Sequence, residues 1–348
     1  MNGDNDIGSV GLADKPVQNV TILGVDGSMA TTIFGPMDIL SQAGRLWNRV
    51  AQSPPTPFFD VTIATANGQP IRCANNAMIQ PHRGIDEIDH SDLVVIASAT
   101  HIEQVLCKSP ELVPWILGQY RKGAHVASIC TGVFLLAETG LLDGKSATLH
   151  WGFTRLFRKR YPQVALASHR MFIDQGRLYC SAGVSAGMDL SLYLVEKLCG
   201  RQAAVASAKA MVLDLPRELQ TPYGTLLLSK DQDHGDPLIT KAQQWIEQHH
   251  TQSIDYDILA GKLAMSRRSL ERRFKQAMGV TPLGYLQQLR VESAKRLLEE
   301  GVLSFNEITY RVGYEDTSFF RKVFIRLAGL RPREYQQRFK GYSAENVR

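Results

Sequence analysis

Cysteine is scarce in this sequence, which contains only five in 348 residues. None belongs to a Cys-x-x-Cys pair, and the count is odd. Both features argue against a disulfide framework and against a structural zinc site, so we expect neither a metal nor a cofactor. A reducing cytoplasm suits these residues, which are Cys73, Cys107, Cys130, Cys180 and Cys199.

Long apolar runs are also missing. No stretch approaches the roughly 20 residues that a membrane-spanning helix needs, and VVIASA at 94–99 has the length of a buried strand. The first ten residues lack the basic segment and apolar run of a signal peptide. We therefore expect a cytoplasmic protein with no membrane partner.

Charge is unevenly distributed along the chain. Residues 237–348 contain 19 Lys and Arg against 12 Asp and Glu, a net charge of +7, whereas the remaining residues have a net charge of −2. A basic third beside a near-neutral body favours a polyanionic partner for that third. A basic surface that is merely solvated would give the same count.

Apolar runs alternate with helical patterns over residues 17–200, after a polar segment at 1–16 that we expect to be disordered. This alternation predicts an α/β domain with a mainly parallel sheet. The segment 170–183 is typical of a hairpin instead, which makes the sheet mixed. The apolar runs lie at 19–25, 59–65, 92–98 and 125–130.

The pattern changes after residue 200. We expect a connecting helix and linker over 201–236, because its second half is rich in Pro, Gly and polar residues. Strand signals end there, and 237–342 predicts an all-α domain.

This C-terminal domain contains an internal repeat. GVTPLGY at 279–285 recurs as GLRPREY at 329–335, and apolar positions upstream recur at the same offset of fifty residues. Each copy has the pattern of a helix, a tight turn and a second helix. Ser266 is placed to cap the second helix of the first copy, and Asp316 that of the second copy.

The second helix of each copy pairs an apolar inner face with a polar or basic outer face. Such a helix fits the major groove, where arginine reaches base edges and neutralises phosphate. A helical bundle with charged outer faces is the alternative, but two matching copies favour DNA. The predicted DNA-facing residues are Arg267, Arg268, Glu271, Arg272, Lys275, Thr317, Ser318, Arg321 and Lys322.

On the segments MSRRSLERRFKQAMGVTPLGY and ITYRVGYEDTSFFRKVF, residues 237–339 resemble the DNA-binding domain of the AraC family. The resemblance implies two helix-turn-helix motifs on a linker helix near 283–299, and control of transcription. One departure is Thr309, where a small Ala is usual. As partners we expect double-stranded promoter DNA, a second copy of the chain in a homodimer, and RNA polymerase.

Cys130 follows the predicted strand HVASI and precedes a helical pattern, which is the arrangement of a nucleophile elbow. The helix N-terminus is expected to lower the pKa of the thiol. His150 is the candidate base, and Asp189 and Asp38 are candidate orienting acids. These residues alone suggest a cysteine hydrolase.

A resemblance to a second family is carried by VASICTGVFLLAETGLLDGKSATLHW and its flanking segments. On this basis, residues 17–200 resemble the PfpI-type branch of the class I glutamine amidotransferase-like superfamily. The resemblance implies a flavodoxin-like sandwich. This chain departs from active members, because Thr32 replaces an acid, Thr131 replaces a His, and Ser98-Ala99 replaces paired glycines.

We therefore interpret the domain as a former enzyme pocket that binds a small, nitrogen-containing effector. Trp151 and Trp47 could together hold a cationic group. The alternative is a cysteine amidase or protease with an accessory nucleic-acid-binding module. The residues predicted to line the pocket are Cys130, Thr131, His150, Trp151 and Asp38.

Overall fold

The computed structural model describes residues 16–214, 219–223 and 234–339. Its chain divides into two compact units, 1–220 and 221–348, and each is described by itself. Nearly all of the predicted disordered N-terminus, and most of the predicted linker, lie outside the described residues. No helix within those ranges is both long and apolar enough to cross a membrane.

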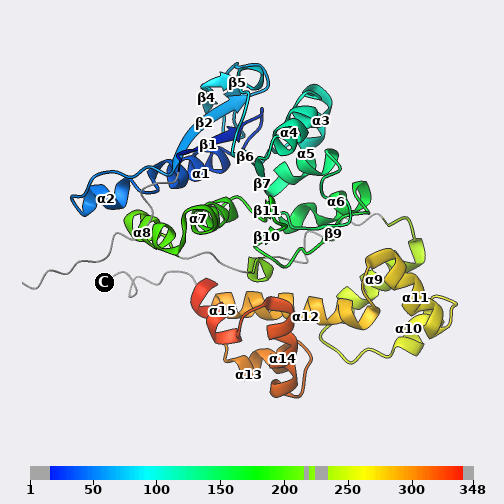
Figure 1. Cartoon of the computed structure of the whole chain (residues 1–348). Helices are drawn as coiled ribbons and strands as arrows, with labels where there is room; N and C mark the ends of the chain where they lie inside the picture. Colours follow the sequence, from blue (N-terminus) through cyan, green and yellow to red (C-terminus); the bar gives the residue numbers. More distant parts are fainter. Residues whose placement is uncertain (1–15, 215–218, 224–233, 340–348) are drawn as a thin grey trace, which may run out of the picture. The chain divides into compact units, whose positions relative to one another are not determined.

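The N-terminal unit is built on one seven-stranded sheet, with strand order β10-β11-β7-β6-β1-β2-β5 (Figure 1). Every neighbouring pair is parallel except β10 with β11, which form the predicted hairpin. The predicted mixed, mainly parallel sheet is thus confirmed. Its strands are β1 (Gln18–Leu23), β2 (Phe59–Thr65), β5 (Arg83–Gly84), β6 (Leu93–Ile96), β7 (His125–Ile129), β10 (Phe172–Asp174) and β11 (Leu178–Ser181).

Helices cover both faces of this sheet. One apolar core lies beneath α1 (Thr31–Gln42), α7 (Ala186–Cys199) and α8 (Arg201–Met211). A second core lies on the opposite face, beneath α3, α4, α5 and α6. This three-layer sandwich is the flavodoxin-like fold predicted from the sequence. The second set of helices comprises α3 (Ile102–Lys108), α4 (Leu112–Arg121), α5 (Val133–Glu138) and α6 (Thr154–Arg160).

Several short elements were not predicted from the sequence. Two-residue strands carry no readable alternation, and a short helix shows less than two turns of periodicity. They are α2 (Leu46–Val50), β3 (Ile71–Arg72), β4 (Met78–Ile79), β8 (Ser146–Ala147) and β9 (Ala165–Leu166), with the single turn η1 (Ile85–Glu87) and the edge strand β5. The single turns η2 (Cys130–Gly132) and η3 (Trp151–Phe153) lie at the start of two segments with a predicted helical pattern.

The described part of the C-terminal unit is helical throughout, as predicted. It begins with the single turn η4 (Thr221–Tyr223), and seven α-helices follow. They are α9 (Pro237–His249), α10 (Tyr256–Lys262), α11 (Arg267–Met278), α12 (Pro282–Glu300), α13 (Phe305–Arg311), α14 (Thr317–Ala328) and α15 (Pro332–Phe339).

The internal repeat appears as two helix-turn-helix units that share α12. The first unit packs Leu270 and Phe274 of α11 into one core, and the second packs Phe320 and Phe324 of α14 into another. Both recognition helices end at a left-handed glycine and are followed by a helix that begins with proline, as the repeated Gly-x-x-Pro pattern predicts. Thr309, the departure from the family pattern, is fully buried, and its hydroxyl donates to the carbonyl oxygen of Phe305.

A buried arginine on the shared helix contacts both units. Arg290 is 7% exposed, and its Nε and Nη2 each donate at 2.7 Å, to the carbonyl oxygens of His250 and Gln252 after α9. Its guanidinium also lies 4.8 Å from the ring centroid of Tyr314, in the turn before α14. Arg290 therefore links the first helix-turn-helix unit of this domain to the turn of the second.

Candidate nucleic-acid interface and ligand site

The first recognition helix, α11, presents a polar and basic face to solvent. Ser266 caps it, because its hydroxyl accepts a hydrogen bond of 3.3 Å from the backbone N–H of Ser269. The predicted DNA-facing side chains of this helix are all exposed, and they are Arg267, Arg268, Glu271, Arg272 and Lys275.

Arg267 differs from the other basic residues of α11, since it already has partners in the protein. Its Nε donates to Glu271 at 3.1 Å and its Nη1 to Asp257 of α10 at 3.3 Å. Both acids are about half exposed or more, so these pairs contribute little to stability. They do orient the Glu271 carboxylate. Arg268 and Arg272 have no ion-pair partner among the described residues and are freer to contact DNA.

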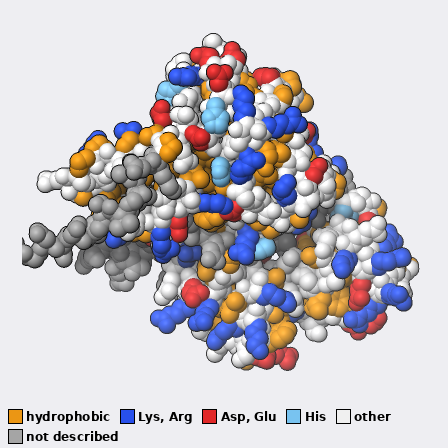
Figure 2. Space-filling view, in the orientation of Figure 1, with side chains coloured by type: hydrophobic (Ala, Val, Ile, Leu, Met, Phe, Trp, Pro, Cys, Tyr) orange, Lys and Arg blue, Asp and Glu red, His pale blue; other side chains and the backbone are white. Residues whose placement is uncertain are grey.

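Asp316 caps the second recognition helix, α14, because its carboxylate accepts hydrogen bonds from the backbone N–H groups of Ser318 and Phe319 at 2.7 and 3.1 Å. Three of the predicted DNA-facing side chains are exposed, namely Ser318, Arg321 and Lys322, while Thr317 is half-buried. Lys and Arg side chains recur over the visible face of the C-terminal unit (Figure 2).

One exposed side chain on this face was not predicted as a DNA contact. Phe319 is 50% exposed and follows Ser318 on α14. An exposed aromatic ring on a recognition helix can contact the methyl group of thymine. The helical period already places Phe320 and Phe324 inward, so the same period could have identified Phe319.

The elbow around Cys130 has the predicted geometry. Cys130 directly follows β7 and has a φ of +54°, the left-handed conformation that places a side chain at a sharp strand-to-helix turn. The turn is tightly packed, because a Cβ atom on Gly132 would lie 2.6 Å from the carbonyl oxygen of Ile96.

The chemistry of the elbow differs from the expectation. Cys130 is only 5% exposed, and burial raises the pKa of its thiol to about 11. Backbone hydrogen bonds from Thr131 and His150 oppose this shift but are outweighed by the loss of hydration. The expected lowering of the pKa is therefore wrong, and the thiol is protonated at neutral pH.

Two threonine hydroxyls near the elbow are hydrogen-bonded to the backbone. Thr131 Oγ accepts from the backbone N–H of Ala99 at 2.9 Å and donates to its carbonyl oxygen at 2.7 Å. Thr32, in place of the acid, accepts from the backbone N–H of Ser98 at 3.1 Å and donates to Met29 at 2.7 Å. Both side chains are fully buried, so the Thr131 hydroxyl braces the turn and is not free to bind a ligand.

The backbone of His150 forms a hydrogen bond with Cys130, and the side chains of His150 and Trp151 are both partly buried. His150 Nδ1 accepts from the backbone N–H of Gly152 at 3.2 Å, and its ring centroid lies 4.8 Å from that of Trp151. Burial lowers the pKa of His150, which keeps the ring neutral. Within the described residues no hydrogen bond joins its imidazole to Cys130.

Asp38, from the predicted pocket, and Trp47, predicted to hold a cation with Trp151, lie elsewhere. Asp38 is exposed on α1, six residues beyond Thr32 and hence roughly 9 Å farther along the helix from the elbow. Trp47 lies on α2, with Lys209 5.9 Å from its ring centroid, whereas η3 with Trp151 directly precedes α6 at the other side of the domain (Figure 1). The two tryptophans therefore cannot hold one cation between them. Asp189, the other candidate acid, is buried in the first turn of α7.

Gln220, which was not predicted as a site residue, is the last residue of the N-terminal unit. Its buried side chain donates from Nε2 to the carbonyl oxygen of Leu149 at 2.9 Å, and lies 3.2 Å from both Thr148 Oγ1 and the Arg170 carbonyl oxygen. The chain thus leaves the domain from a point fixed beside the loop that carries His150. A polar residue in a linker gives no sequence signal of such burial.

Comparison with known proteins agrees with this architecture. Residues 19–197 match the model of the DJ-1/PfpI family, which covers just over half of the chain. This chain belongs to the DJ-1/PfpI family. Residues 259–338 match a helix-turn-helix domain model, and the predicted AraC-type double helix-turn-helix domain is confirmed.

Two named regulators align with this chain over more residues than either of its two units contains. The HTH-type transcriptional regulator GbdR of Pseudomonas aeruginosa is 28% identical over 271 residues, which cover 78% of this chain and 73% of GbdR. The HTH-type transcriptional regulator CdhR of the same organism is 29% identical over 262 residues, which cover 75% of this chain and 77% of CdhR.

Among solved structures, a putative transcriptional regulator from Vibrio parahaemolyticus superposes with a TM-score of 0.50 at 25% identity. The superposition covers 56% of this chain and 98% of the Vibrio regulator's chain. A ThiJ/PfpI family protein from Pseudomonas syringae superposes with a TM-score of 0.51 at 16% identity and shows the shared fold. The protein is thus a DNA-binding regulator of the AraC type with a DJ-1/PfpI domain.

Proposed function

We propose that this protein changes the transcription of its target genes when a small, nitrogen-containing metabolite binds its DJ-1/PfpI domain. The observation that carries the DNA-binding half of this proposal is the pair of capped recognition helices with exposed basic faces. Two named transcriptional regulators, GbdR and CdhR, align with both units of this chain, which supports a sensor role for the N-terminal unit.

We also propose that the Cys130 elbow does not catalyse a reaction. A nucleophilic cysteine needs thiolate and a base that accepts its proton. Here burial keeps the Cys130 thiol protonated, the position of the acid is held by a fully bonded Thr32, and the His150 ring has no hydrogen bond to Cys130 among the described residues. These features favour a ligand-binding domain over the alternative of a cysteine amidase or protease.

We further propose that the loop that carries His150 and Trp151 communicates with the linker. These two side chains are partly exposed, and Gln220 binds the two residues just before them. A ligand that moves this loop would move the start of the linker, provided that it binds the two arrangements with different affinity. A homodimer on promoter DNA, contact with RNA polymerase and a cytoplasmic location belong to the same proposal.

The test combines a metabolite library with DNA binding by the full chain. Fluorescence anisotropy on a selected DNA site should show a change in Kd with at least one metabolite, and Gln220→Ala should reduce that change. Wild-type protein should release no product from amide or peptide substrates. Turnover that disappears in Cys130→Ser would establish the enzyme instead, and DNA affinity that no metabolite alters would refute the sensor.

A further inference from the structure

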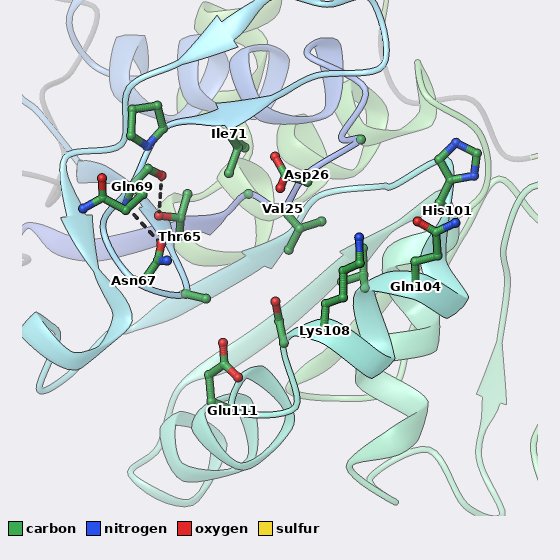
Figure 3. A pocket seen from close by; sticks show the side chains of 16 residues that line it. Val25, Asp26, Thr65, Asn67, Gln69, Ile71, His101, Gln104, Lys108 and Glu111 are labelled. Carbon is green, nitrogen blue, oxygen red and sulfur yellow. Dashed lines mark hydrogen bonds between the residues drawn. The ribbon is translucent and has the colours of Figure 1, made fainter.

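A crevice at the carboxyl edge of the sheet is distinct from the Cys130 elbow. It has a volume of about 380 Å³ and is lined by the loops after β1 and β2 and by α3 with the loop that follows it (Figure 3). A second hollow, lined in part by Arg72 and Cys73, adjoins it and shares Asp26 and His101. Neither Cys130 nor His150 belongs to the wall of either hollow.

The topology of the sheet explains why a crevice lies here. β1 has β2 on one side and β6 on the other. The helix after β1 covers one face of the sheet, and the helix after β6 covers the opposite face. The two connections therefore diverge and leave a crevice outside the strand ends, which is where open α/β sheets bind ligands.

The base of the crevice is apolar. Val25, Ile71 and Val105 contribute side chains that are each no more than 7% exposed. Polar side chains from three different segments surround this base, as is typical of a site for a small molecule. Among them are Asn67 and Gln104.

Opposite charges project into the crevice from different walls. Asp26 lies on the loop after β1 and Lys108 at the end of α3, with its ammonium group pointing toward the cavity (Figure 3). Asp26 Oδ1 accepts the backbone N–H of Arg72 at 2.9 Å, which fixes the carboxylate while Oδ2 stays available. Within the described ranges Lys108 has no ion pair, so both groups can bind a ligand.

We propose that this crevice binds the effector, and that the effector is a small zwitterion such as an α-amino acid. Lys108 binds its carboxylate, Asp26 binds its cationic nitrogen, and its aliphatic part lies over the apolar base. The proposal rests on the effector response proposed above and names its site and ligand class. A ligand with only one charge would form only one of these two ion pairs and would therefore bind more weakly.

The crevice also has a physical connection to the elbow. The backbone N–H of Thr100 donates to the carbonyl oxygen of Gly27, in the crevice wall, at 3.0 Å. The preceding residue, Ala99, is held by both hydrogen bonds of Thr131 next to Cys130. Displacement of the loop after β6 by a ligand would therefore reach the elbow and the segment that Gln220 holds.

The test is a thermal-shift titration of the full chain with glycine, the other nineteen standard amino acids in their L-form, and γ-aminobutyrate. Butylamine and butyrate serve as singly charged probes. We expect at least one zwitterion to raise the Tm, while the two singly charged probes leave it unchanged. Asp26→Asn and Lys108→Gln should each raise the Kd of that zwitterion about tenfold or more. Glu103→Gln, an exposed change on α3 outside the crevice wall, is the matched control and should bind as wild type does.

Three results would overturn the proposal. No shift with any zwitterion would refute the ligand class, and an equal shift with butylamine would refute the double-charge requirement. Wild-type affinity in both crevice variants, with loss of binding in Trp151→Ala, would assign the ligand to the elbow. In that last case the proposed sensor function stands, whereas it fails if no metabolite of any class alters DNA binding.

Discussion

Arg290 should set the spacing between the two recognition helices. It is the buried side chain of α12 that binds the loop after α9 and also stacks on Tyr314 before α14. The two helix-turn-helix units are close together here, since a Cβ atom added to Gly313, in the turn before α14, would lie 2.5 Å from the carbonyl oxygen of Thr251, after α9. Arg290→Ala should therefore leave each helix-turn-helix unit folded but loosen one against the other.

The magnitude follows from the bonds that are lost. A hydrogen bond to a charged group contributes about 1.5–3 kcal/mol, and a desolvated cation–π contact contributes about 2 kcal/mol. Arg290 makes two such hydrogen bonds and one such contact. Because water can reach the freed carbonyls, we expect a net loss of about 3 kcal/mol. If half or more of this appears in DNA binding, the affinity for a complete site falls about tenfold to hundredfold.

The assay is anisotropy with the full chain on a complete DNA site and on two sites that each keep one half. Arg290→Ala should lose affinity on the complete site and change little on either half-site. Arg296→Ala removes the same charge from an exposed position of α12 and is the control. Equal losses on all three sites, or wild-type affinity on the complete site, would refute the proposed role of Arg290.

Three further predictions follow. Arg272→Ala should relax base preference in one half of the DNA site and Lys322→Ala in the other, at about 1–3 kcal/mol per lost base contact, in a binding-site selection; equal weakening on random DNA would assign them to phosphates. The raised thiol pKa of Cys130 stabilises the fold below about pH 9, and this contribution is lost as pH rises toward about 11, so Cys130→Ser should flatten the alkaline decline in Tm. An unchanged decline contradicts this. Gln220→Ala should keep effector binding but weaken its influence on DNA affinity; an undiminished influence would show that the linker anchor plays no part.

Much of the fold could be predicted because its signals are local. The strand runs, the caps at Ser266 and Asp316 and the glycines that end both recognition helices act through neighbouring residues. The mainly parallel sheet then followed from the alternation of strands and helices, whereas its two-residue edge strand β5 was not predicted.

The ligand site could be predicted less well, because burial and partners depend on distant segments. The helix N-terminus suggested a reactive thiol, but packing around Cys130 determines its pKa. Thr131 was expected to bind a ligand, yet its hydroxyl is used by Ala99. The crevice around Asp26 and Lys108 joins segments that lie thirty or more residues apart, and no spacing in the sequence indicates that they meet.

The central claim is that the two basic helices recognise a DNA sequence. The most direct test is selection of binding sites by the full chain from a randomised duplex library, followed by titration against competitor DNA at several salt concentrations. We predict one enriched bipartite site, bound more tightly than random DNA, with an affinity that falls steeply as salt rises. Recovery of no enriched sequence, with equal affinity for all duplexes at moderate salt, would contradict the account.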